Sequence, residues 1–224
     1  LRYMTAPNGA AWSRSIFATS TFVTVANHCD ELVALKSGAI KKRYEAGGTY
    51  SYDEEPADVI DKMLDTFAGR IYITEGGLFG LTCDGIEEPE IVITADKVLE
   101  ISANRRTGAL YEVTTIRSRF SSDQHGYIEL AEEADPWIDE TLADQIGREI
   151  PSQFDLPYVF RHDQARRLMK RKFYDLNPEW DIEATLDVEG LELFGENVCR
   201  FVYPLLGIDQ TFRVISVALD QSSG

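Results

Sequence analysis

Apolar residues recur at helical spacing near residue 170 of this 224-residue chain, with strand-like patterns on either side. The members of the helical stripe fall three or four positions apart and are Ala165, Leu168, Met169, Phe173 and Leu176. This spacing predicts a helix over residues 163–177, with Asp163 or the adjacent His162 as N-cap and Pro178 just beyond its end. Residues 156–160 before it and the alternating W-D-I-E-A-T-L at 180–186 read as strands. The predicted unit is therefore a helix lying across a sheet.

A second unit is predicted between residues 56 and 83. Pro56 suits the first position of a helix, and acidic residues gather around it, where the helix dipole favours them. The apolar face of this helix ends at Phe67, and we expect Gly69 to follow it with left-handed geometry. Residues 70–74 and 78–83 are then expected to form a hairpin around the Gly76-Gly77 turn.

Elsewhere the pattern predicts mainly short strands. Residues 11–30 favour a helix, whereas residues 129–149 hold eight acids and read as a loop or short helix. The expected strands cover 32–35, 40–44, 91–93, 111–120, 180–188, 191–194, 198–203 and 211–219, with one helical turn near Ala95. The polar stretch 104–108 ends in a glycine and is the best candidate for a boundary. The sequence thus predicts an α+β protein with two modules, at 1–108 and 109–224.

The chain has a formal net charge of −16 at pH 7, yet five cations lie on the predicted helix 163–177. A chain this acidic argues against non-specific DNA binding and against an anionic membrane surface. No apolar run approaches the ~20 residues that span a bilayer. The helix cations therefore face water, an external anionic surface, or an acidic surface of the same chain or of a neighbouring subunit. The last alternative makes four of them candidate subunit-interface residues: Arg166, Arg167, Lys170 and Arg171.

The sequence shows no catalytic, cofactor-binding or metal-binding pattern. The cysteines stand far apart, which predicts free, buried thiols at Cys29, Cys83 and Cys199. None of the histidines has the spacing of a zinc ligand: His28, His125 and His162. The acids of 129–149 lack the alternation and turn glycine of a calcium loop, and no nucleophile elbow or phosphate-binding loop occurs. The residues alone therefore predict a non-catalytic protein without cofactor or metal.

Several motifs, in a fixed order along the chain, resemble one family of phage proteins. They are R-Y-E-A-G-G-T-Y at 43–50 with a helix from Pro56, A-G-R-I-Y-I-T-E-G-G-L-F-G-L at 68–81, D-L-P-Y-V at 155–159, Q-A-R-R-L-M-K-R at 164–171 and G-L-E-L-F-G-E-N at 190–197. Together they resemble the hub domains of phage tail-tip and baseplate proteins, of the host-specificity protein J type, over roughly residues 29–220. The chain departs from the family where Gly47-Gly48 replaces an Asn-Gly and where residues 194–197 replace a Pro-Gly-Asp turn.

The resemblance implies a structural protein of the virion tail tip, made and assembled in the host cytoplasm. It implies a β-barrel-like hub domain at 109–224, a homotrimeric ring that continues the tail tube, and contacts with other tail-tip and tail-tube proteins. This chain would be the hub-bearing part of a longer protein whose other regions contact the host receptor. No sequence-specific nucleic-acid partner, membrane-spanning segment, catalytic residue or cofactor is implied, and an acidic lumen would repel DNA phosphates and let the genome slide.

Two other functions stay open at the level of sequence. A tail-associated, carboxylate-dependent cell-wall hydrolase needs two carboxylates facing each other about 5–10 Å apart in a cleft. A host-surface glycan-binding module needs exposed aromatic anchors, for which Trp137 and Trp180 are the candidates.

Overall fold

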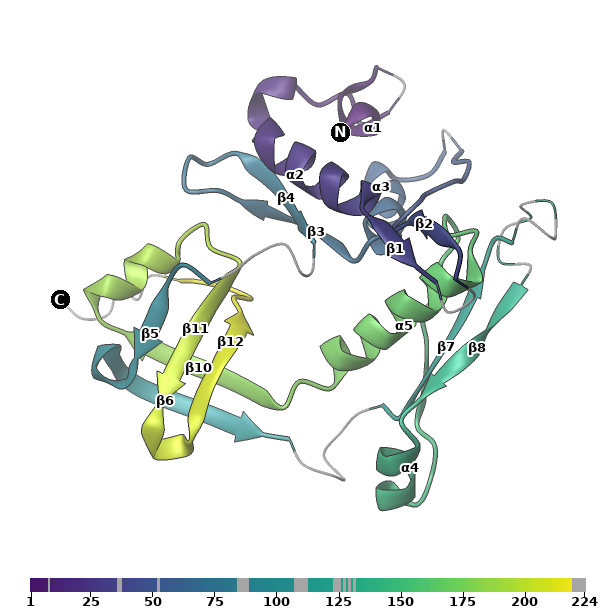
Figure 1. The fold of residues 1–224 in the computed structure, drawn as a ribbon. Helices are drawn as coiled ribbons and strands as arrows, with labels where there is room; N and C mark the ends of the chain where they lie inside the picture. The colour runs from purple at the N-terminus through teal and green to yellow at the C-terminus, as the bar shows by residue number, and fades with distance from the viewer. Residues whose placement is uncertain are drawn as a thin grey trace.

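The computed structural model describes residues 1–7, 9–35, 38–51, 53–83, 89–106, 113–122, 126, 128, 130 and 132–218. Figure 1 shows three lobes grouped around one long helix, α5 (His162–Leu176). Each lobe has its own cluster of buried apolar side chains, so the core is divided into three parts. The predicted α+β class is confirmed, and helix α5 lies within one residue of the predicted bounds 163–177.

The N-terminal lobe contains α3 (Pro56–Asp65) and the hairpin β3 (Gly69–Ile73) and β4 (Phe79–Cys83), as predicted. The helix predicted over residues 11–30 is shorter: α2 covers Thr19–Asp30. Short helices α1 (Arg2–Thr5) and η1 (Arg14–Ile16) precede them. The predicted strands around Gly38 are β1 (Leu32–Ala34) and β2 (Ile40–Lys42), which form a second hairpin; Ser37 lies outside the described residues. The buried residues of the apolar cluster in this lobe are Met4, Phe17, Phe22 and Ile60.

The prediction for Gly69 is wrong in its reason. Ala68 takes the left-handed conformation, with φ 53°, and Gly69 begins strand β3. A Cβ atom on Gly69 would overlap the ring of Phe67. Glycine is therefore required at this position because the Phe67 ring packs against the backbone, and not because of the backbone dihedral.

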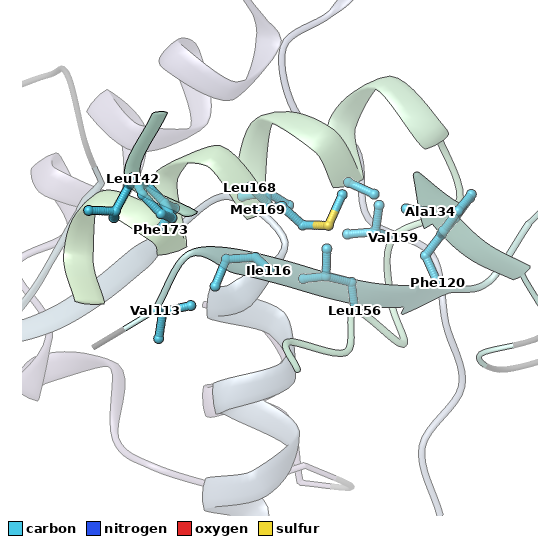
Figure 2. Packing of buried hydrophobic residues seen from close by; sticks show 11 residues of the cluster. Val113, Ile116, Phe120, Ala134, Leu142, Leu156, Val159, Leu168, Met169 and Phe173 are labelled. Atoms are coloured by element: carbon cyan, nitrogen blue, oxygen red, sulfur yellow. The ribbon is translucent and has the colours of Figure 1, made fainter. Parts of the chain in front are cut away.

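The central lobe is a three-stranded sheet covered by α5. Strand β7 (Thr115–Phe120) lies between antiparallel β8 (Glu132–Ile138) and parallel β9 (Pro151–Gln153), and α4 (Glu140–Ile146) follows β8. Figure 2 shows α5 packing across this sheet, with Leu168 and Met169 directed toward Ile116 and Leu156 and Phe173 beside Leu142. Tyr111 and His125 lie outside the described residues.

Two expectations in this lobe are wrong. Residues 132–138 form a strand where a loop or short helix was expected, because Ala134 and Trp137 pack on the apolar cluster while Glu133 and Asp135 are exposed. Residues 156–160 form no strand: Leu156 makes a single bridge to Phe120 before the chain turns. Both stretches take their conformation from contacts with β7, which lies more than ten residues away in sequence.

The C-terminal lobe contains two small sheets packed around one cluster. One has the order β12–β11–β5, formed by Ile208–Arg213, Val198–Tyr203 and Val92–Thr94, and the other pairs β10 (Trp180–Leu186) with β6 (Val98–Arg105). Short helices η2 (Ala95–Lys97), η5 (Val188–Leu193) and η6 (Pro204–Leu206) connect the strands. The helical turn near Ala95 and strands 180–186 and 198–203 are confirmed.

Other details of this lobe differ from the predictions. Strand β6 was not expected, residues 191–194 lie in or beside a 3-10 helix, and the last strand covers 208–213 instead of 211–219. Among the described residues of 109–224 the strands form no closed barrel. The division into 1–108 and 109–224 stays a prediction, and two strand pairs cross it, β5 with β11 and β6 with β10.

Candidate subunit interface on helix α5

Helix α5 buries one face and carries cations on the other, as its periodicity predicts. The predicted stripe is buried or packed against the central cluster, and the helix ends at Leu176, before Pro178. The expected N-cap is wrong: Arg161 occupies that position and its side chain caps no backbone N–H. Asp163 lies in the first turn, where its carboxylate instead binds two arginines.

Arg161 is the centre of a polar network between α5 and the segment that follows β2. Its side chain is 6% exposed, and its guanidinium lies 2.8 Å from Asp163 Oδ2 and 2.5 Å from Glu45 Oε2. It also donates to the backbone carbonyl of Lys42, at 3.1 Å. A guanidinium this deeply buried needs paired anions, because desolvating an unpaired charge costs several kcal/mol. Arg161 therefore holds residues 42–45 against the start of α5.

Gln164 fastens the same segment through its amide group. Its side chain is fully buried, and Nε2 donates to the carbonyls of Glu45 and Thr66 at 2.9 and 2.8 Å. Its Oε1 accepts the backbone N–H of Glu45 at 3.1 Å. One side chain thus joins α5 to the chain after β2 and to the end of α3.

The four candidate interface cations each have a partner within the chain. Arg166 lies 3.7 Å from Asp135, and Arg167 lies 3.0 Å from Asp163 and also donates to the carbonyl of Arg43. The ammonium of Lys170 lies 5.2 Å from the centre of the Trp137 ring. The last cation, Arg171, lies 3.0 Å from Asp175. The helix cations are therefore largely engaged by acidic and aromatic groups of their own chain.

These contacts shift the pKa of Asp163. Burial acts to raise it, but hydrogen bonds from Arg161 and the charges of Arg161 and Arg167 outweigh burial and hold the pKa below its usual range. Asp163 is thus a stable anion at neutral pH and a fixed partner for both arginines.

The far end of α5 is fastened to the C-terminal lobe. Asp175 binds Arg213 of β12 at 2.7 Å, and the carbonyl of Leu176 accepts a hydrogen bond from Arg106 at 3.3 Å. The side chain of Asn177 makes two hydrogen bonds with the backbone of Val113: its Oδ1 accepts from the N–H at 3.3 Å, and its Nδ2 donates to the carbonyl at 2.6 Å. Helix α5 therefore touches all three lobes and holds them in one arrangement.

The described residues contain no cluster of three or more His, Cys, Asp or Glu side chains arranged to hold a metal ion. Within those same residues, no helix is long and apolar enough to span a bilayer. All three cysteines lie in the described part of the chain and none forms a disulfide; Cys83 and Cys199 are buried as predicted, whereas Cys29 is only half-buried. Burial raises the pKa of the Cys29 thiol to about 11, so this sulfur is a poor nucleophile at neutral pH.

One open depression, of about 520 Å³, brings two carboxylates together between α3 and β3. Burial, with a smaller contribution from Asp61, raises the pKa of Asp65, although Lys172 acts in the opposite sense. Asp61 and Asp65 lie one turn apart on the same helix and so belong to the same wall of the depression. A glycosidase holds its two carboxylates on opposite sides of the scissile bond, which this arrangement does not provide.

The two tryptophans proposed as glycan anchors are half-buried. Trp137 packs against the central cluster with Lys170 over its ring, and Trp180 packs against the C-terminal cluster with Arg105 over its ring, at 5.4 Å. Neither ring presents the open face on which a sugar stacks.

The residues that organise this site, Arg161 and Gln164, were not singled out by sequence reasoning. Apart from Asp163, their partners lie more than 90 residues away in sequence, and an arginine or glutamine at the start of an amphipathic helix gives no local sign that it is buried. Arg161 lies between the D-L-P-Y-V and Q-A-R-R-L-M-K-R motifs and Gln164 opens the second, so these motifs were the closest available signal.

No family model matches this chain, and no curated protein is significantly similar to it. Similar solved structures include the tail protein from Neisseria meningitidis MC58, with a TM-score of 0.46 and 10% identity over 71% of this chain and 47% of that chain. Another is the 43 kDa tail protein of prophage MuSo2 from Shewanella oneidensis, with a TM-score of 0.44 and 13% identity over 74% of this chain and 48% of that chain. This chain spans about half the length of both proteins. Both TM-scores lie below 0.5, so neither likeness identifies the function of this chain.

Proposed function

We propose that this chain is a structural component of a phage or prophage tail, a piece of the hub protein at the tail tip. The order of motifs along the chain supports this identity. The main observation in favour of a structural role is the large solvent-accessible surface of the chain.

The chain exposes 13683 Å², whereas a monomeric protein of 25.2 kDa exposes about 10,300 Å². The exposed surface is thus about a third larger than expected for a monomer. Large aliphatic side chains contribute to it, among them Leu32, Leu99, Val188 and Leu205. A divided core and exposed aliphatic side chains are typical of a subunit whose remaining apolar surface is covered by neighbouring subunits in an assembly.

In the assembled tail we infer a homotrimeric ring that continues the tail tube and links it to host-recognition parts. Of the candidate interface cations, Arg166 and Lys170 suit this role best. The Arg166–Asp135 pair joins two exposed side chains at 3.7 Å and is worth little in water, so Arg166 can exchange its partner for a neighbouring subunit. Arg167 instead belongs to the internal network of Asp163.

The proposal includes no catalysis by this chain. Its test is the composition of purified virions: mass spectrometry of washed particles should detect this chain, and gold-labelled antibody against it should decorate one end of the tail. Particles that lack the chain while the lysate contains it would overturn the proposal.

The hydrolase alternative rests on Asp61 and Asp65 and has a separate test. If these carboxylates were catalytic, the purified chain would clear a peptidoglycan zymogram and Asp65→Asn would abolish the clearing. We expect no clearing from either protein.

A further inference from the structure

The C-terminal lobe is joined to the central lobe by a narrow neck at the end of α5 (Figure 1). Strand β6 leaves the lobe where β10 enters it, and the N–H of Arg106 bonds there to the carbonyl of Glu179 at 2.8 Å. Beyond this pair, the side chain of Asn177 bonds to the backbone of Val113. The neck is therefore two strands wide, and a few residues at the ends of elements are enough to form a hinge.

This lobe also has a core of its own. Its apolar cluster is centred on Ile93, Phe201 and Ile208, and among the described residues every member belongs to this lobe. Two bodies with separate cores are expected to move relative to each other unless a large apolar interface joins them. The boundary between the C-terminal and N-terminal lobes therefore decides whether the neck acts as a hinge.

That boundary contains a cleft of about 790 Å³. Strand β3 and the turn after it form one wall, and residues 193–197 and 213–217 form the other. Large apolar side chains of both walls stay exposed, at 62% for Ile73, 38% for Phe194 and 83% for Ile215. The two walls thus face each other without burying these side chains, and this part of the boundary resists separation weakly.

A backbone contact between two turns fastens the lobes beside the cleft. Gly195 has a φ of 92°, and a Cβ atom built on it would lie 2.7 Å from the backbone nitrogen of Glu75, in the turn between β3 and β4. Only glycine allows so close an approach, so the two turns touch backbone to backbone. The G-L-E-L-F-G-E-N motif at 190–197 contains this glycine and so provides the contact.

A second fastening, between α5 and β12, can be released without leaving a carboxylate unpaired. Arg213 lies 2.7 Å from Oδ1 of Asp175, and Arg171 lies 3.0 Å from the same oxygen. If Arg213 moves away, Asp175 keeps Arg171 as its partner. The side chain of Arg213 is 26% exposed already, so water can solvate it after release.

We propose that the C-terminal lobe is a hinged body that pivots at the neck beside Asn177 and is latched to the N-terminal lobe by the Gly195–Glu75 contact. Figure 1 shows the latched state; in the other state the two turns separate and the cleft opens. Cys83 and Pro89 are six residues apart along the chain, so the lobes can part there by at most about 20 Å. The motion takes place within one copy and does not depend on the proposed tail role.

Distances between two spin labels, measured by double electron–electron resonance, test the hinge. The labels are attached to Val23→Cys in α2 and Leu205→Cys in η6, both exposed, in a Cys29→Ser chain. Cys83 and Cys199 are buried, and the Cys29→Ser chain without added cysteines measures any label that they take up. We expect one main distance, from the latched state, and a minor longer one.

Two variants should shift these populations. Gly195→Ala should raise the population of the longer distance about tenfold, because parting the lobes relieves the overlap of the new Cβ with Glu75. Arg213→Gln should shift the populations in the same direction, since it removes the ion pair with Asp175 and leaves the backbone of both turns unchanged.

Gly207→Ala is the matched control. Gly207 lies in the same lobe and has a φ of 67°, but beyond its chain neighbours no atom lies within 4 Å of where its Cβ would be. This variant carries the same kind of backbone strain and should leave the distances unchanged. A label pair inside the lobe, Leu191→Cys with Leu205→Cys, should keep its distance in Gly195→Ala, because the lobe moves as one body. Equal distributions in Gly195→Ala and Gly207→Ala, or a change within the lobe as large as that between lobes, would overturn the proposal.

Discussion

Replacing Gln164 with leucine tests whether the buried network holds the lobes together. Leucine has a similar volume but cannot bond the Thr66 carbonyl or the two backbone groups of Glu45 that Gln164 now satisfies at 2.8–3.1 Å. Each buried polar group left without a partner costs about 1–3 kcal/mol. Thr66 is fully buried and takes that full cost, whereas Glu45 is half-buried and water can partly replace the lost bonds.

The free energy of unfolding should therefore fall by about 2–4 kcal/mol in Gln164→Leu. Urea unfolding followed by far-ultraviolet circular dichroism measures it. Hydrogen exchange gives a local readout, because the amide of Glu45 should lose its protection. Gln145→Leu, at an exposed position of α4, is the matched control and should change stability by less than about 0.5 kcal/mol. A Gln164→Leu chain as stable as this control, with Glu45 still protected, would refute the network's role.

Three further predictions concern single side chains. Gly48→Ala should destabilise the fold by about 1–3 kcal/mol in a thermal melt, because a Cβ there would overlap the ring of Tyr158, while Gly76→Ala, whose Cβ has room, should be near neutral. Asp163→Asn should lower the free energy of unfolding at pH 7. Because the folded-state pKa of Asp163 is depressed, the difference in free energy of unfolding between wild type and variant should become smaller as pH falls below about 4. A difference that does not change with pH would contradict this prediction. Asp65→Asn should raise the free energy of unfolding at pH 7 or leave it unchanged. Burial raises the pKa of Asp65, so the carboxylate that is ionised at pH 7 opposes folding. A clear decrease in the free energy of unfolding, measured with urea, would contradict this prediction.

Elements with strong local signals were predictable from the sequence. Helix α5 was placed within one residue, and α3 and the β3–β4 hairpin followed from Pro56 and the Gly76-Gly77 turn. These elements are decided by side-chain periodicity and turn chemistry over a few residues. Strand β10 also fits this rule, because its alternation matches its half-buried and exposed faces.

Elements decided by distant contacts were not predictable. Strand β6 was missed because its alternation is weak and its partner β10 lies more than 70 residues later. Strand β8 looked like a loop because Pro136 and the acids mask Ala134, the one residue of the strand that is fully buried. Arg161, just before α5, is buried because it pairs with Glu45, which is distant in sequence. The sequence pattern of α5 therefore indicates a basic surface, although this end of the helix binds another part of the same chain.

A cryo-electron microscopy reconstruction of intact tails tests the central claim, that this chain acts as a building block of the tail tip, most directly. The account predicts density for the three lobes and α5 in repeated copies at the end of the tail tube. A tail tip without this fold, or a chain found only free in the lysate, would contradict the account.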